Sequence, residues 1–120
     1  MAAMEHKPEK PSIKLYYSDL LKDTTLVDQI LYGAEEEGIP VDISRVSGDN
    51  VLELAYKASK DSRLETGIGV SSTYAAVNIA KLSMDKPIYL VRLNAGMDAL
   101  RRVGNNGARM VKRMPLKIED

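Results

Sequence analysis

The chain has 120 residues, of which 44% are hydrophobic, and its 17 basic residues balance 17 acidic ones. This length fits one globular domain, and the balanced charge provides no electrostatic case for binding nucleic acid or a membrane surface. Cysteine is absent, which excludes thiol nucleophiles, thiolate metal ligands and disulfides. No apolar run approaches the roughly 20 residues that cross a bilayer, so we expect a cytoplasmic protein.

Two short tails are expected to flank one folded domain. Residues 1–11 contain two prolines among charged side chains and therefore predict a flexible N-terminal tail. The domain is expected to span residues 12–116, followed by a C-terminal tail at residues 117–120. The only histidine, His6, lies in the first tail, where a general base would have no fixed geometry.

A strand and a helix open the predicted domain. Residues 12–17, SIKLYY, are rich in strand formers. Apolar residues then recur at the spacing of one helix face, at Leu26, Val27, Ile30, Leu31 and Ala34. The candidate N-caps of this helix are Asp23, Thr24 and Thr25. Gly38 in the left-handed conformation, followed by Pro40, is expected to end the helix.

The alternation of strand and helix continues along the chain. Residues 41–47 predict a second strand. The helix after it has an apolar stripe of Val51, Leu54, Ala55 and Ala58. Residues 66–72, TGIGVSS, predict a short strand, and residues 73–82, TYAAVNIAKL, a further helix. Residues 87–93, PIYLVRL, form the most continuously apolar run, which favours a strand buried on both faces in the middle of a parallel sheet.

The last predicted helix spans residues 98–113 and contains an unusual segment, GNNG, at residues 104–107. Glycine and asparagine are poor helix formers, so we expect a break or kink there. The succession of strands and helices implies right-handed βαβ units. We therefore expect an α/β fold, namely a small three-layer, flavodoxin-like sandwich with a mostly parallel four-stranded sheet.

The segment GIGVSS allows two interpretations. Ser71, Ser72 and Thr73 would offer hydroxyl and backbone donors to a phosphate at a helix N-terminus. However, no lysine follows as in a P-loop and no complete GxGxxG is present. The alternative is structural: the glycines permit close packing of a helix, and Ser72 acts as an N-cap.

Three consecutive glutamates, Glu35, Glu36 and Glu37, lie at the predicted C-terminus of the first helix. This end of a helix carries partial negative charge and normally attracts cations. One interpretation is that a surface triplet is tolerated, because each unfavourable contact costs only about 0.3–1 kcal/mol. The other is functional: successive helix residues point in different directions, so a single carboxylate is offered to a cation on another chain.

The C-terminal part of the chain is basic. From Arg92 to Asp120, basic residues outnumber acidic ones by seven to three. Arg109, Lys112 and Arg113 suit the C-terminus of the last helix, but this does not explain GNNG, because departures from local propensity tend to mark function or an unusual backbone contact. An acidic region and a basic region in one chain indicate an interaction subunit.

Two segments taken together resemble one family. GAEEEGIP at residues 33–40 and RRVGNNGARMVKRMP at residues 101–115, separated by LAYKASKDSRLETGIGVS, are similar to the small subunit of diol and glycerol dehydratase-reactivating factors. The resemblance covers nearly the whole predicted domain. The chain departs from the family pattern at Gly107, Arg113 and Leu116, where alanine, glycine and an aromatic residue are common.

The resemblance implies a non-catalytic, chaperone-like subunit with the fold of the dehydratase medium subunit. It implies a large ATPase subunit as partner in a two-plus-two heterotetramer, with ATP or ADP and magnesium at that large subunit and no cofactor bound by this chain alone. The complex would bind a diol or glycerol dehydratase transiently and release damaged cobalamin by subunit exchange. It would work in the cytoplasm, either free or in association with a bacterial microcompartment.

The resemblance also implies roles for individual residues. Glu36, the middle glutamate, would reach the magnesium ion at the interface with the large subunit. The other implied partner-binding positions are Glu35, Glu37, Asn106, Arg109 and Lys112. No catalytic residue is expected.

Two other readings stay open. The first is a stand-alone flavodoxin-like module that binds a nucleotide or phosphate through GIGVSST; stabilisation of the chain by flavin or free nucleotide, without any partner, would favour it. The second is a dehydratase medium subunit, which is expected to carry extra chain and cobalamin contacts that this sequence does not show.

Overall fold

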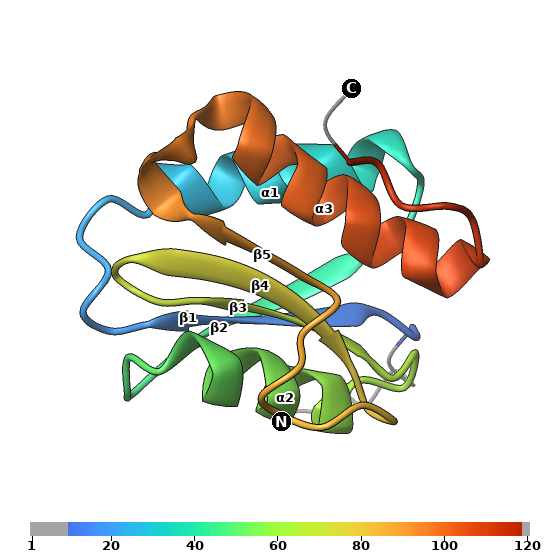
Figure 1. Ribbon diagram of the computed structural model, residues 1–120, viewed down its shortest axis with the longest axis horizontal. Coiled ribbons are helices and arrows are strands. Elements are labelled where there is room, and N and C mark those ends of the chain that lie inside the picture. The colour runs from blue at the N-terminus through green and yellow to red at the C-terminus, as the bar shows by residue number, and fades with distance from the viewer. Residues whose placement is uncertain (1–9, 119–120) are drawn as a thin grey trace, which may run out of the picture.

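The computed structural model describes residues 10–118. Within them, one five-stranded sheet lies between α1 and α3 on one face and α2 on the other (Figure 1). The elements in chain order are β1 (Ile13–Ser18), α1 (Thr25–Glu36), β2 (Val41–Val46), α2 (Val51–Asp61), β3 (Thr66–Val70), β4 (Tyr74–Ile79), β5 (Tyr89–Arg92), the 3₁₀ helix η1 (Leu93–Ala95) and α3 (Met97–Lys112). His6 and most of the expected N-terminal tail lie outside the described residues.

The sheet is mixed. Its strand order is β2-β1-β3-β4-β5, in which β1 pairs in parallel with β2 and β3, whereas β4 runs antiparallel to β3 and β5. The expected three-layer α/β sandwich is confirmed, and β2-β1-β3 is the parallel arrangement of a flavodoxin-like sheet. The expected number of four strands is wrong, because β4 is an additional strand between β3 and β5 and runs antiparallel to both.

The error arises at residues 73–82, which we expected to be a helix. They contain β4, which is joined to β3 by a tight turn and whose central residues Ala75, Ala76, Val77 and Asn78 are completely buried. A short apolar run that is buried on both sides shows neither helical nor strand periodicity, so its pattern cannot distinguish the two. Pairing with β3 decides the conformation.

The most apolar run is also in an unexpected place. Residues 87–93 contain β5, an edge strand in which Leu90 is 47% exposed. The central strand is β3, which is buried at every residue. Its glycines let α2 lie directly on it: a Cβ at Gly67 would come within 2.1 Å of the Ser59 nitrogen, and one at Gly69 within 2.4 Å of the Ala55 nitrogen. The structural interpretation of these glycines is confirmed.

The first helix begins and ends largely as expected. Asp23 accepts a hydrogen bond from the Thr25 nitrogen at 3.1 Å at the start of α1, and Gly38 after its end has φ +77°. Asn50 caps α2 by accepting from the nitrogens of Leu52 at 3.0 Å and Glu53 at 3.2 Å. The predicted apolar stripe of α2 is buried, since Val51, Leu54, Ala55 and Ala58 are each at most 8% exposed.

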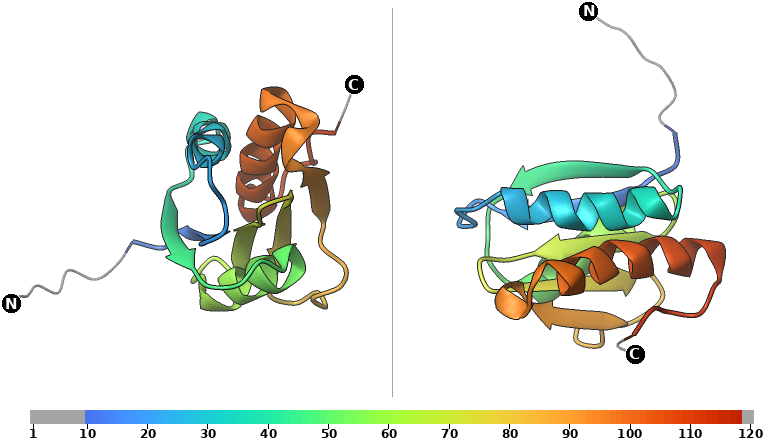
Figure 2. Two further views of the ribbon diagram at one scale, coloured as in Figure 1. Left: turned by 90° about the vertical axis from the view of Figure 1, so that its left-hand side faces the viewer. Right: turned by 90° about the horizontal axis from the view of Figure 1, so that it is seen from above.

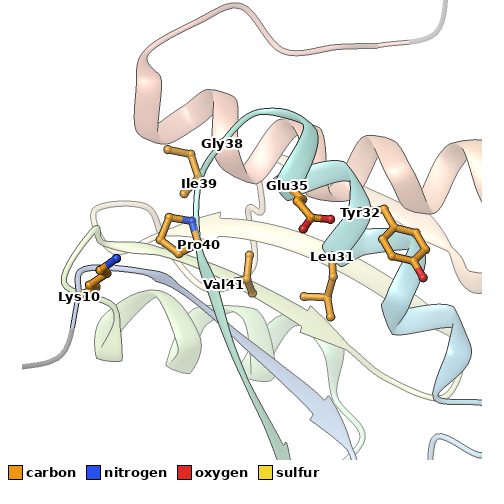
Figure 3. Close-up of a pocket in the computed structure, with 8 residues that line it drawn as sticks. All are labelled: Lys10, Leu31, Tyr32, Glu35, Gly38, Ile39, Pro40 and Val41. Carbon is orange, nitrogen blue, oxygen red and sulfur yellow. The ribbon is translucent and has the colours of Figure 1, made fainter. Parts of the chain in front are cut away.

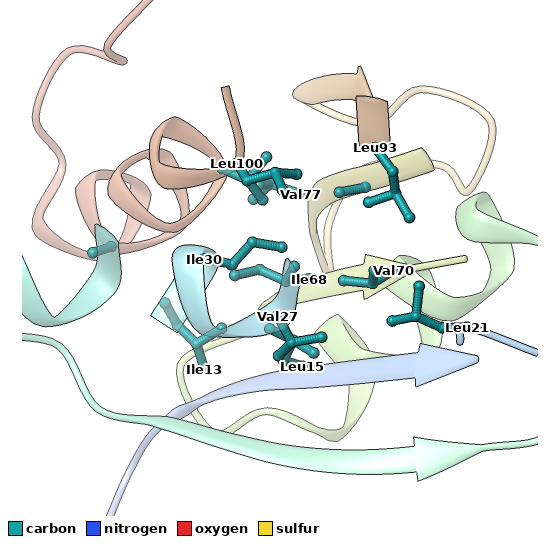
Figure 4. Packing of buried hydrophobic residues seen from close by; sticks show 13 residues of the cluster. Ile13, Leu15, Leu21, Val27, Ile30, Ile68, Val70, Val77, Leu93 and Leu100 are labelled. Carbon is teal, nitrogen blue, oxygen red and sulfur yellow. The ribbon is translucent and has the colours of Figure 1, made fainter. Parts of the chain in front are cut away.

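The main core lies between the sheet and the α1–α3 layer (Figure 4). Strands β1, β3 and β4 contribute side chains from the sheet, and α1 and α3 contribute side chains that pack on them. The largest completely buried members of this core are Ile13, Leu15, Ile30, Ile68, Val70, Val77 and Val103. Seen from above, α1 and α3 lie side by side across the sheet (Figure 2). No helix within residues 10–118 is long and apolar enough to span a membrane.

Helix α3 is continuous from Met97 to Lys112, so the expected break at GNNG is wrong. The reason is tertiary. A Cβ at Gly104 would lie 1.9 Å from the Ile30 carbonyl oxygen of α1, and a Cβ at Gly33 would lie 2.0 Å from the Arg101 carbonyl oxygen of α3. The two glycines therefore let the helices touch backbone to backbone, and this packing stabilises a segment of poor helix propensity.

Candidate functional site at the crossing of α1 and α3

The crossing of α1 and α3 places the last turn of α1 over the middle of α3. Asn105, which is 1% exposed, donates from Nδ2 to the Gly33 carbonyl oxygen at 2.8 Å and to Glu36 Oε1 at 3.1 Å. The carbonyls in this turn carry the partial negative charge of the helix end. An amide donor from a neighbouring helix therefore supplies the positive partner that α1 lacks in its own sequence.

Glu36 is held at both carboxylate oxygens. Besides the Asn105 bond at Oε1, Oε2 accepts from Arg101 Nη1 at 3.0 Å. The hydrogen bond from Asn105, followed by that from Arg101 and its charge, lowers the pKa of the Glu36 carboxyl group below its ordinary value. Its side chain is still 47% exposed. An ionised carboxylate of fixed direction is thus presented at the protein surface.

Glu37 points to the other side of the same crossing. It forms ion pairs with Lys112 Nζ at 2.8 Å and Arg109 Nε at 3.0 Å, and its backbone oxygen accepts a further bond from Lys112 Nζ at 2.9 Å. The Lys112 hydrogen bond, followed by that from Arg109, lowers the pKa of this carboxyl group. Its side chain is only 12% exposed, so Glu37 joins α1 to the end of α3.

Glu35 differs from its two neighbours. It is exposed, and no described residue forms an ion pair or a hydrogen bond with its carboxylate. It lines a groove of about 630 Å³ between the end of α1 and strand β2 (Figure 3). The apolar residues of this groove are Leu31, Tyr32, Ile39, Pro40 and Val41. The three glutamates therefore have three different environments, as helix geometry predicts.

Asn106 lies inward and is completely buried. Its Nδ2 donates to the Lys117 carbonyl oxygen at 3.0 Å, and its Oδ1 accepts from the Lys117 nitrogen at 2.6 Å. Asn106 thus ties the segment that follows α3 back onto the helix. The two asparagines of GNNG serve different ends, since Asn105 binds α1 whereas Asn106 binds the chain after α3.

Two of the departures from the family pattern have structural explanations. The nearest atom to a Cβ at Gly107 would be Ile68 Cδ1 at 3.2 Å, a flexible side-chain end, and Ile13 Cδ1 would lie at an ordinary contact distance of 3.5 Å, so alanine could be accommodated there. Arg113 ends α3 in the left-handed conformation with φ 59°, which glycine adopts without strain. Nothing in the structure explains Leu116.

Arg101 and Asn105 were not predicted from the sequence as functional residues. A signal for both was present, because Arg101, Asn105, Arg109 and Lys112 recur at intervals of four, four and three residues and so share one face of a helix. This face is the one that meets the glutamates. Because we expected the helix to break at GNNG, residues before and after this segment were not expected to share one helix face.

No group of three or more histidine, cysteine, aspartate or glutamate side chains within residues 10–118 could hold a metal ion. Magnesium prefers oxygen ligands and usually takes only one or two carboxylates from a protein, completing its shell with water and phosphate. Glu36 fits the role of one such carboxylate, because its two oxygens are oriented and its side chain remains half exposed.

The GIGVSS segment does not have the geometry of a phosphate site. It ends in the turn between β3 and β4, so neither a helix N-terminus nor a helix cap exists at Ser72. The Ser72 nitrogen and hydroxyl both donate to the Asp49 carboxylate, at 2.7 and 2.5 Å. Ser71 Oγ accepts from the Thr73 and Tyr74 nitrogens. The donors that a phosphate would need are already bound to the protein.

Comparison with known proteins agrees with this geometry. Residues 10–117 match the family of dehydratase medium subunits. The chain is 34% identical to the propanediol dehydratase-reactivating factor small subunit of Citrobacter freundii, over 78% of this chain and 81% of that protein. It is 31% identical to a probable glycerol dehydratase-reactivating factor small subunit of the same organism, over 88% and 92% of the two chains.

Two solved structures share the fold. A glycerol dehydratase reactivase chain superimposes with a TM-score of 0.87 at 28% identity, covering 91% of this chain and 98% of the other. A chain of diol dehydratase-reactivating factor in complex with ADP and Mg²⁺ gives a TM-score of 0.84 at 29% identity, covering 92% and 100%. The chain therefore belongs to the dehydratase medium subunit family, among the small subunits of diol and glycerol dehydratase-reactivating factors.

Proposed function

We propose that this chain acts as the non-catalytic small subunit of a dehydratase-reactivating factor and assembles with a large subunit that hydrolyses ATP. In this proposal the complex is a two-plus-two heterotetramer that binds a diol or glycerol dehydratase transiently. Exchange of subunits between the complex and the dehydratase then opens the enzyme, so that damaged cobalamin leaves. The names of the relatives support the reactivating role.

The observation that carries the proposal is the presentation of Glu36. Its ionised carboxylate is fixed by α3 and half exposed at the end of α1. We propose that Glu36 contributes one oxygen ligand to magnesium at the nucleotide site of the large subunit, which is in keeping with the ADP and Mg²⁺ in the related complex. A ligand supplied across an interface couples nucleotide state to the affinity between the subunits.

The remaining predicted positions surround Glu36 in the proposed interface. Glu35 adds negative charge and lines the adjacent groove. Glu37, Arg109 and Lys112 form the edge of the surface and keep α3 against α1. Asn106 is buried beneath this surface and holds the segment after α3 in place through its bonds to Lys117.

The test compares alanine substitutions at the three glutamates. Binding of the full chain to its cognate large subunit is measured with ADP and Mg²⁺ and again with EDTA, while circular dichroism reports folding. Glu36→Ala is expected to leave the chain folded and to remove most of the Mg²⁺-dependent part of the affinity. Glu35→Ala should retain this part. Equal losses for Glu35→Ala, Glu36→Ala and Glu37→Ala would refute a special role for the middle glutamate.

A further inference from the structure

Helix α3 holds the two oxygens of Glu36 through residues of opposite character. At Oε1 the donor is Asn105, a neutral amide that is 1% exposed and that also binds the Gly33 backbone. At Oε2 the donor is Arg101, a cation whose side chain is 41% exposed. One contact is therefore built into the helix crossing, and the other lies at the surface.

Separating the Asn105 side chain from Glu36 would cost a large amount of free energy. Its Nδ2 serves two acceptors of α1, whereas its buried Oδ1 has no hydrogen-bond partner among the described residues. A buried unpaired oxygen is unfavourable, and an apolar side chain at this position would avoid it. The position is therefore explained by the two bonds from Nδ2, which fix the end of α1 and the direction of the Glu36 carboxylate together.

Arg101 can exchange its partner more easily. Its Nη2 donates to Gln29 Oε1 at 3.0 Å, and its guanidinium lies 5.8 Å from the centre of the Tyr32 ring. Both contacts can persist when Glu36 Oε2 binds another cation in place of Arg101. Exposed ion pairs contribute little to stability, and a guanidinium next to a carboxylate that binds a second cation is repelled by that cation.

From these contacts we propose that Asn105 is the positioning residue that aims Glu36 at the partner, and that Arg101 is a counter-cation which the partner's magnesium replaces. The inference rests on the proposed function of Glu36. It assigns opposite effects to two neighbouring residues of one helix face: Asn105 promotes Mg²⁺-dependent assembly, and Arg101 competes with it. A purely structural role for the two residues would give no such opposition.

The experiment titrates Mg²⁺ at fixed ADP and measures assembly of the full chain with its large subunit. The quantity compared is the Mg²⁺ concentration at half-maximal assembly. Asn105→Ala should raise this midpoint about tenfold or more, as loss of residues that orient a metal ligand commonly does. Arg101→Gln should lower it roughly two- to fivefold, the range of a removed surface ion pair. Arg101→Lys, which keeps the charge, should stay near the wild type.

Two further variants separate positioning from folding. Asn50→Ala removes the cap of α2 on the opposite face of the sheet and should lower thermal stability without moving the Mg²⁺ midpoint. If Asn105→Ala does not fold, Asn105→Ser takes its place, since a hydroxyl has a single proton for the two acceptors, and a raised midpoint is again expected.

The outcomes are distinct. A raised midpoint for Asn105→Ala together with a lowered midpoint for Arg101→Gln supports the inference, and the reverse pair of shifts overturns it. Midpoints that move together, or that stay at the wild-type value, overturn it and leave the proposed function intact. If the wild-type chain binds its large subunit without any Mg²⁺ dependence, the role of Glu36 in the proposed function is wrong and this inference fails with it.

Discussion

Glycines bring a helix into backbone contact on both faces of the sheet, but the two contacts differ in what they bury. Under α2, Gly67 and Gly69 face a helix surface of small residues, and the contact only packs the backbone of the helix closely against the strand. At the crossing of α1 and α3, Gly33 and Gly104 lie beside a buried amide and ion pairs that end at a half-exposed carboxylate.

The difference teaches how to separate packing from function in this fold. Close approach of a helix is explained by core density alone, as the α2 face shows. Buried polar groups cost free energy unless they are hydrogen-bonded. At the α1–α3 crossing the polar bonds orient Glu36 and Glu37, which is the basis of the proposed function.

The largest expected effect tests the crossing itself. Gly104→Ala would place a Cβ 1.9 Å from the Ile30 carbonyl oxygen, and we expect a loss of about 3 kcal/mol or more in the free energy of unfolding, because backbone cannot move aside. Gly67→Ala, on the α2 face, should cost a similar amount. Urea denaturation followed by circular dichroism measures both.

Gly107→Ala is the matched control for these substitutions. The closest atom to its Cβ would be a flexible Ile68 methyl group at 3.2 Å, and alanine favours a helix by about 1 kcal/mol over glycine. Gly107→Ala should change the free energy of unfolding by less than about 1 kcal/mol in either direction. A Gly104→Ala protein as stable as Gly107→Ala would show that the helices are not in backbone contact.

A smaller effect is expected where Glu37 joins the two helices. Glu37→Ala removes the partner of both Lys112 and Arg109, and we expect a loss of about 2 kcal/mol, typical of hydrogen bonds to charged groups. Glu35→Ala, at an exposed position, should change stability by less than about 0.5 kcal/mol. Similar losses for the two variants in urea denaturation would contradict the different environments that the structure gives them.

The smallest effect is a pH dependence that belongs to the same pair of helices. The pKa of Glu37 is lowered in the folded chain by Lys112 and Arg109. The ionised Glu37 therefore contributes its full stability above the pKa of the unfolded state, which is about 4.3, and this contribution is lost as the pH falls through the lower pKa of the folded state. Between pH 6 and 3, the wild type should lose more stability than Glu37→Ala. Parallel losses in urea denaturation at each pH would show that Glu37 gains nothing from its ion pairs.

The sequence by itself determined the features that depend on near neighbours. The strand and helix at the start of the domain, the apolar stripe of α2 (Val51–Asp61) and the turn at Gly38 follow from side-chain periodicity and from residues that permit a helix end. The different directions of the three glutamates follow from helix geometry alone. The sequence also carried the family resemblance that the comparisons confirm.

Only the tertiary structure decided the remaining features, because they depend on residues distant in the chain. Residues 74–79 are a strand because they pair with β3 and β5. Helix α3 crosses GNNG without a break because Gly104 packs on Ile30. The bond from Asn105 to Gly33 joins residues 72 positions apart. Glu36 and Glu37 find their cations on α3, which no local pattern in their own segment could reveal.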